Sequence, residues 1–70
     1  MFDYSKLTGR IIEVFKSQSA FAKAMKMSAN TFSNKINGRI DFKASEMHEA
    51  ITLLGLTAAD IPTYFFTLKD

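Results

Sequence analysis

The chain has 70 residues, 47% of them hydrophobic, which predicts a single small domain with a modest core. It contains no cysteine, which excludes disulfide bridges and thiolate metal sites and fits a reducing compartment. The apolar runs are too short to cross a membrane, and the start of the chain does not resemble a signal peptide. We therefore expect a cytoplasmic protein without a membrane partner.

Charge is unevenly distributed along the chain, although the net value is only +2. Residues 1–43 contain eight basic and three acidic residues, a net charge of +5, whereas residues 44–70 have a net charge of −3. Five basic residues and no acid occur between Val14 and Ile40. This half of the chain suits a polyanionic partner, and solubilising lysines on a helical surface are the alternative.

The first predicted helix spans residues 3–16, and Asp3 or Ser5 can cap it. Gly9 weakens the helix interior by about 1 kcal/mol relative to alanine, so we expect close packing there. Four apolar residues at helical spacing form the predicted buried face: Leu7, Ile11, Ile12 and Phe15. Three charged residues are expected on the outer face: Lys6, Arg10 and Glu13.

Residues 18–38 predict two short helices joined by a tight turn, which is a helix-turn-helix unit. Ser28 is the expected N-cap of the second helix, which runs from about Ala29 to Ile36. Lys26 falls in the turn, where a left-handed backbone costs a lysine about 1 kcal/mol. The expected core residues of the unit are Phe21, Ala22, Met25, Met27, Phe32 and Ile36.

The second helix of such a unit can offer its polar face to a DNA major groove. Its outer residues here are small or medium and include no acid, and asparagine can bond adenine edges. The predicted DNA-binding residues are Gln18, Ser28, Ala29, Asn30, Thr31, Ser33, Asn34, Lys35, Asn37, Arg39 and Lys43. The alternative is a helical hairpin in another small bundle, with these polar residues facing water.

The C-terminal part predicts a helix over residues 46–54 with Ser45 as its cap, and then one helical turn over residues 57–61 closed by Pro62. Ile40 and Phe42 are expected to anchor the preceding connector. The core stripe of the helix is predicted at Met47, Ala50, Ile51 and Leu54. The aromatic tail consists of Tyr64, Phe65 and Phe66, which either complete the core or form an interface.

Catalysis is not expected, because no convergent acid, base and nucleophile can be assembled. Glu46 and Glu49 share a helix face, but His48 points elsewhere on the same helix. The three scattered glycines form no phosphate-binding loop, and a single histidine is insufficient for a metal site. The sequence therefore predicts neither a cofactor nor a small-molecule ligand.

Residues 18–38 resemble the Cro/repressor family of helix-turn-helix regulators in Gln18, Ala22, Met27-Ser28, Phe32-Ser33 and Ile36-Asn37-Gly38. With MFDYSKLTGRI and DIPTYFF, the whole chain resembles the small Cro-like modulators of repression of lactococcal phages. The resemblance implies a compact five-helix domain that acts in the lysis–lysogeny switch in the bacterial cytoplasm. It also implies that Ala29, Asn30 and Asn34 occupy base-reading positions, and that Gln18 and Asn37 contact phosphate.

The resemblance leaves two functions open. In the first, the chain binds the phage repressor as an antirepressor, through Glu46, Glu49, Tyr64, Phe65 and Phe66. In the second, it binds double-stranded operator DNA independently, as a homodimer on paired half-sites. Three departures from the family pattern bear on the second function: Lys26 in the turn, Ala29 at a reading position, and Lys35 at a usually apolar position, where its charge can reach phosphate.

Overall fold

The computed structural model describes residues 2–69, whose regular secondary structure is helical apart from one isolated antiparallel bridge between Phe2 and Leu68. In chain order the helices are α1 (Ser5–Phe15), α2 (Gln18–Ala24), α3 (Ala29–Ile36), α4 (Ala44–Leu53), the 3-10 turn η1 (Ala58–Asp60) and α5 (Ile61–Phe65). The described chain measures 28 × 25 × 21 Å. The predicted compact, all-α, five-helix fold is confirmed.

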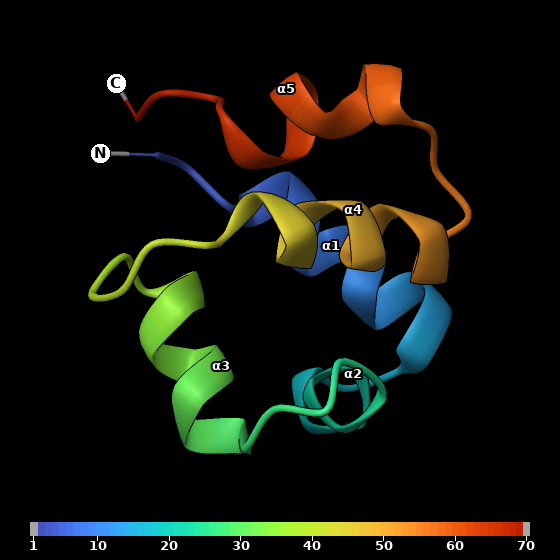
Figure 1. Cartoon of the computed structure of the whole chain (residues 1–70), viewed down its shortest axis with the longest axis vertical. Coiled ribbons are helices and arrows are strands. Elements are labelled where there is room, and N and C mark those ends of the chain that lie inside the picture. The colour runs from blue at the N-terminus through green and yellow to red at the C-terminus, as the bar shows by residue number, and fades with distance from the viewer. Residues whose placement is uncertain (1, 70) are drawn as a thin grey trace.

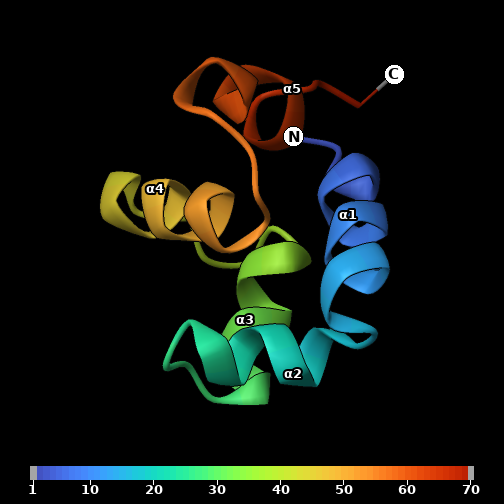
Figure 2. The same cartoon turned by 90° about the vertical axis from the view of Figure 1, so that its right-hand side faces the viewer.

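The helices form three levels along the longest axis of the molecule. The α2–α3 unit lies at one end, and α5 lies at the other end with both termini (Figure 1). Helices α1 and α4 occupy the middle, on opposite sides of the view in Figure 2. Helix α1 contacts both α2 and α5, so it connects the two ends of the molecule.

A series of phenylalanine rings runs through the core between the two ends. The centroids of Phe21 and Phe32 are 5.5 Å apart, those of Phe32 and Phe42 are 6.2 Å apart, and those of Phe42 and Phe65 are 5.2 Å apart. All three pairs meet edge to face, which is a favourable geometry for aromatic quadrupoles. Phe42 therefore anchors the connector between α3 and α4, as predicted. It also links the α2–α3 unit to α5.

Several predicted core positions are exposed instead. Ile12 is 44% exposed because Leu7 and Ile11 already fill the face of α1 that meets the core, and Ile12 lies about 100° further around the helix. Ile40 is 47% exposed, so it does not anchor the connector. Gly9 is also exposed, and no heavy atom beyond its chain neighbours and the nearby backbone of α1 lies within 4 Å of where its Cβ would be, so the expected close packing at this glycine is wrong.

Two helix boundaries differ from the prediction. Helix α4 begins at Ala44 with Lys43 as its N-cap residue, and the Glu46 carboxylate accepts a hydrogen bond from the Lys43 backbone N–H at 2.8 Å. Ser45 therefore lies inside the first turn and is not the cap. Pro62 is the second residue of α5 and does not close the preceding turn. Proline is tolerated there because backbone N–H groups in the first turn of a helix have no intrahelical acceptor.

Arg10 connects α1 to the end of α4. Its Nε and Nη2 atoms donate to the backbone carbonyl of Leu54 at 3.1 and 2.8 Å. Carbonyls in the last turn of a helix lack an intrahelical partner, so this bidentate contact satisfies one of them. The predicted solvent-facing position of Arg10 is wrong, because the guanidinium reaches across a helix junction that only the tertiary fold creates.

The turn between α2 and α3 has the predicted left-handed residue. Lys26 has a φ of 60° and an exposed side chain. We expect Lys26→Gly to raise the free energy of unfolding by about 1 kcal/mol, because glycine has no Cβ to strain this conformation. Urea denaturation measures the change. The matched control is Lys23→Gly within α2, which is expected to lower stability by about 1 kcal/mol, and equal signs for both variants would contradict the prediction.

Candidate functional site

Both helices of the α2–α3 unit are capped by serine side chains. Ser17 Oγ accepts a hydrogen bond from the Ala20 N–H at 3.1 Å, and Ser28 Oγ accepts one from the Thr31 N–H at 3.0 Å. The predicted N-cap at Ser28 is confirmed. Its hydroxyl also donates to Thr31 Oγ1 at 2.9 Å, so both side chains are already engaged at the start of α3.

Helix α3 carries five of the eleven predicted DNA-binding residues at exposed or half-buried positions. Ala29 and Asn30 are exposed, whereas Thr31, Ser33 and Asn34 are half-buried. Helix α3 extends toward the end of the molecule opposite the termini (Figure 1). The structure therefore brings these residues together on one helix surface.

Two asparagines on or after α3 are bonded to their neighbours. Asn34 Oδ1 accepts a hydrogen bond from Arg39 Nη1 at 3.4 Å, and Asn37 Nδ2 donates to Ser33 Oγ at 3.2 Å. The Arg39 contact is long and uses one of the two lone pairs of Asn34 Oδ1, so it competes with a base edge for that oxygen without excluding it. Asn30 is the exposed asparagine of α3.

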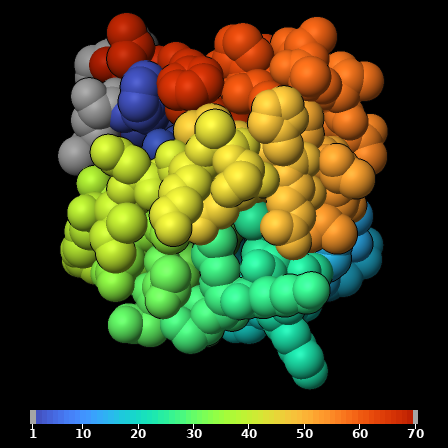
Figure 3. All heavy atoms as spheres, in the orientation of Figure 1, coloured from blue at the N-terminus to red at the C-terminus, as the bar shows by residue number. Residues whose placement is uncertain are grey.

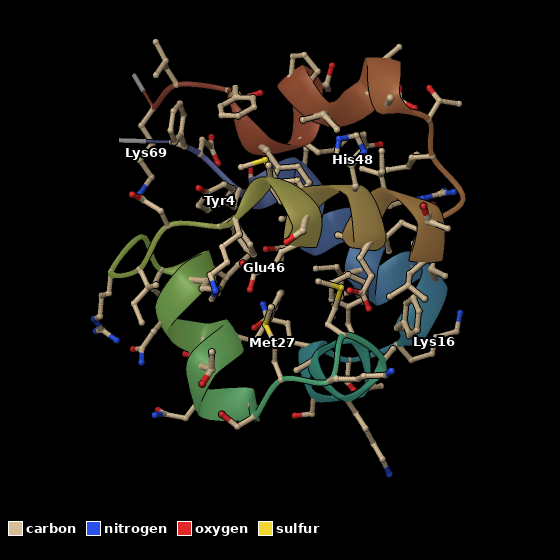
Figure 4. The ribbon with its side chains drawn as sticks, viewed as in Figure 1. Tyr4, Lys16, Met27, Glu46, His48 and Lys69 are labelled. Carbon is tan, nitrogen blue, oxygen red and sulfur yellow. The ribbon has the colours of Figure 1, made fainter. Side chains whose placement is uncertain are left out.

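Lys35 is buried, and its charge does not reach the surface. Its side chain is 6% exposed, and Nζ donates to both carboxylate oxygens of Glu46, at 2.6 and 2.7 Å. Glu46 extends from α4 toward α3 (Figure 4). The expectation that Lys35 contacts phosphate is wrong, because a buried ammonium requires a counter-charge and Glu46 supplies it within the fold.

The same ion pair changes the role of Glu46, which is a predicted partner-binding residue. Its side chain is 17% exposed and accepts hydrogen bonds from Lys35 and from the Lys43 backbone N–H. Burial disfavours its charged form, but these hydrogen bonds and the nearby lysine charges outweigh burial and lower the pKa of Glu46 below its usual value of 4.5. Glu46 thus holds α3 against α4 and is not free to bind a partner.

Acid is expected to destabilise the fold through Glu46. A carboxyl whose pKa is lower in the folded state adds stability above its unfolded pKa and loses it as pH falls through the folded value. Unfolding of the chain followed in urea should therefore show stability declining from about pH 5 downward. Glu46→Gln should show a weaker decline over the same range. Parallel pH profiles for the two proteins would contradict this role of Glu46.

Basic side chains surround the α2–α3 unit, apart from the buried Lys35. Lys23, Lys26, Arg39 and Lys43 are exposed. Gln18 is half-buried at the first position of α2. The exposed basic residues make this surface positive. Its charge is lower than the sequence alone suggests, because Glu46 neutralises Lys35.

The remaining predicted partner-binding residues have different environments. Glu49 is exposed on α4, Tyr64 is half-buried, Phe65 is fully buried and Phe66 is 46% exposed. Phe65 therefore completes the core, and its predicted role in direct partner contact is wrong, because a buried ring is not accessible to a second protein. Phe66 is accessible to another molecule.

A pocket lies beside the paired ends of the chain, and we call it the terminal pocket. It has a volume of about 250 Å³ and is lined by Phe2, Tyr4, Asp41, Phe42, Met47, Phe65 and Phe66. The N-terminal, 40s and C-terminal segments meet at the surface in Figure 3. Burial, and then the negative charge of Asp41, raise the pKa of the Tyr4 hydroxyl above its usual value of 10.0.

Neither the terminal pocket nor the Lys35–Glu46 ion pair was predicted from the sequence. The signal for the pair is a lysine at an apolar position of α3, which requires an acid elsewhere in the chain. The terminal pocket has no comparable signal, because its lining residues come from positions 2 to 66 of the chain.

The arrangement of residues 2–69 also bears on metal binding and membrane insertion. Within this range no group of three histidine, cysteine, aspartate or glutamate side chains is arranged to hold a metal ion. None of the helices in the described part of the chain has the length and apolar character needed to span a bilayer.

The fold defines a small, all-helical protein in the described residues, with the two short helices α2 and α3 joined by a tight turn at one end. The chain belongs to the family described as "Protein of unknown function (DUF739)", which matches residues 1–68. No curated protein matches the chain.

Among solved structures, the chain is similar to the solution structure of the modulator of repression (MOR) of the temperate bacteriophage TP901-1 from Lactococcus lactis. The two chains share 43% sequence identity with a TM-score of 0.83, over 93% of this chain and 88% of the other. The predicted resemblance to phage modulators of repression is confirmed by this similarity.

Proposed function

We propose that this chain is a phage transcriptional regulator that modulates repression in the lysis–lysogeny switch by binding the phage repressor. The observation that carries this proposal is the 43% identity, over 93% of the chain, to a modulator of repression from a temperate phage. As a regulator of this kind it would act as an antirepressor in the cytoplasm of the bacterial host, without catalysis.

The chemistry of α3 supports a protein partner over direct reading of DNA. Lys35 is held by Glu46, and the Asn34 amide oxygen is held by Arg39. Ala29 has no hydrogen-bonding side chain, so Asn30 is left as the exposed residue of α3 best suited to read a base. A domain with so few side chains free to read bases is better suited to binding another protein than to sequence-specific recognition of DNA.

The simplest mechanism is occlusion. The chain pairs with the DNA-binding domain of the repressor and covers the helix with which the repressor reads its operator. Mixing the two purified proteins at micromolar concentration and measuring the mass of the product tests this directly. We expect one species with the summed mass and loss of repressor from operator DNA, whereas two species at the separate masses would contradict the proposal.

A second candidate function is independent operator binding as a homodimer. The stretch from Val14 to Ile40 contains no acid, and Lys23, Lys26 and Arg39 are exposed around the α2–α3 unit. Phosphate contacts of this kind make binding strongly dependent on salt.

A mobility-shift titration on the promoter region of the same phage, at two salt concentrations, tests operator binding. This function predicts a preference over random DNA at both salts, and weaker binding by Arg39→Ala to all sequences. Equal affinity for promoter and random DNA would exclude it.

A further inference from the structure

The pair Asn37-Gly38 ends α3, and both residues are exposed. Asn37 is the C-cap residue of the helix, and Gly38 follows it with a φ of 80°. A residue with a Cβ is strained in this left-handed conformation, so the fold favours glycine directly after Asn37. The segment after α3 projects from the body of the molecule (Figure 1), which leaves the pair open to water.

An asparagine that precedes a glycine is the most reactive asparagine of this chain. The backbone nitrogen of the following residue can attack Cγ of the asparagine side chain, and glycine places no side chain in the way. The chain has three asparagines, and Asn37 is the one followed by glycine. Asn30 lies inside α3 and precedes the β-branched Thr31. Asn34 also lies inside α3 and precedes the buried Lys35.

Hydrogen bonds at the end of α3 hold the pair in a turn. The Gly38 N–H donates to the Lys35 carbonyl at 3.1 Å, and Asn37 Nδ2 donates to Ser33 Oγ at 3.2 Å. Asn37 has a ψ of 3°, which aligns the Gly38 nitrogen with the Asn37 nitrogen and not with Cβ. Attack on Asn37 Cγ therefore requires rotation about its Cα–C bond and loss of the Lys35 contact. Helix ends open locally at low cost, so fraying of the last turn of α3 is sufficient.

We propose that Asn37-Gly38 is a deamidation site that lowers the positive charge of the α2–α3 unit. The Gly38 nitrogen forms a bond to Asn37 Cγ, the bond from Cγ to Nδ2 breaks, and ammonia leaves with the proton of the Gly38 amide. Water then adds to either carbonyl carbon of the resulting cyclic imide. Cleavage of the new bond gives aspartate, and cleavage of the original peptide bond gives isoaspartate, whose backbone runs through Cβ. This inference does not depend on the partner that the proposed function assigns to the chain.

The product changes the surface on which it forms. A carboxylate replaces a neutral amide at the C-terminal end of α3, where the helix dipole disfavours negative charge. The carboxylate also lacks the N–H that Asn37 donates to Ser33 Oγ. The net charge of the chain falls by one from its value of +2, on a surface where Lys26 and Arg39 are exposed. We therefore expect the product to bind a polyanion more weakly than the fresh chain does.

Peptide mapping of the full chain, after incubation in mildly alkaline heavy-oxygen water, tests the proposal. Trypsin cuts after lysine and arginine, so Asn37 is recovered in the fragment 36–39, whereas Asn30 and Asn34 are recovered together in the fragment 27–35. We expect mass spectrometry to show two products of the fragment 36–39 with equal mass, each carrying one heavy oxygen, and an unchanged fragment 27–35. The converted chain should elute from immobilised heparin at lower salt than the fresh chain.

Two variants and one change of conditions complete the test. Asn37→Gln keeps an amide but lengthens the side chain, so it should abolish both the conversion and the change in heparin elution. Asn30→Gln, at the exposed asparagine of α3, is the matched control and should leave conversion at Asn37 unchanged. The same incubation in urea measures the reaction without the fold, and circular dichroism verifies that each variant is folded.

Three results would overturn the inference. Conversion in urea but none in the folded chain would show that α3 shields the pair. Equal conversion of the fragments 36–39 and 27–35 would show that the glycine does not direct the reaction. Unchanged heparin elution of the converted chain would show that the new carboxylate does not alter the positive surface.

Discussion

Replacing Lys35 with alanine is expected to lower the free energy of unfolding by about 3 kcal/mol. The substitution removes the ammonium that donates to both oxygens of Glu46 and leaves that carboxylate largely buried without its counter-charge. It also removes the ion pair that joins α3 to α4 in the described chain. Urea denaturation at pH 7, followed by circular dichroism, gives the change.

A double substitution separates the cost of an unpaired charge from the net value of the pair. Lys35→Met combined with Glu46→Leu replaces the ion pair with apolar groups of similar size, and we expect it to recover most of the stability lost by Lys35→Ala. Glu49→Ala, on the exposed side of α4, is the control and should change stability by less than about 0.5 kcal/mol. A loss below about 1 kcal/mol for Lys35→Ala would show that the ion pair does not hold the two helices together.

Replacing Phe65 with alanine is expected to cost about 3–5 kcal/mol, the range for removing a fully buried phenylalanine. Its ring packs edge to face against Phe42 with centroids 5.2 Å apart, and α5 contacts both α1 and α4. Because a domain of this size is only marginally stable, the melting temperature should fall by about 15 °C or more. Thermal melting by circular dichroism measures this shift.

Phe66→Ala is the matched control, since the same residue type is removed at the next position. Phe66 is 46% exposed, so its loss should cost less than about 1 kcal/mol. Similar melting temperatures for Phe65→Ala and Phe66→Ala would contradict the assignment of Phe65 to the core and Phe66 to the surface.

Local features of the chain could be predicted because they depend on nearby residues. The serine cap of α3 and the left-handed Lys26 in the turn both follow from spacing and backbone chemistry within a few positions. The burial of Phe21, Phe32 and Leu54 follows from helical periodicity. By contrast, Ile12 and Ile40 are apolar but exposed, since only the docking of neighbouring helices decides which side of an apolar stripe is covered.

The candidate site was predicted less completely than the fold. The polar surface of α3 was found from its composition, but the burial of Lys35 was not, because its partner Glu46 lies eleven residues further along the chain on another helix. The contact of Arg10 with the Leu54 carbonyl spans 44 residues and has no local signal. Polar side chains that the sequence suggests are free to bind a partner thus form hydrogen bonds within the protein, and these bonds form only when the helices pack together.

The sequence by itself determined the helical class, the place of the α2–α3 unit and the family resemblance, because capping, periodicity and motif spacing are local properties. Only the tertiary structure decided which charged and aromatic groups remain free to bind a partner. Packing α3 against α4 neutralises Lys35, and packing α5 beside the N-terminus buries Phe65 while leaving Phe66 and Asp41 at the terminal pocket. The physical reason is that burial and charge pairing depend on three-dimensional proximity between segments that are distant in the chain.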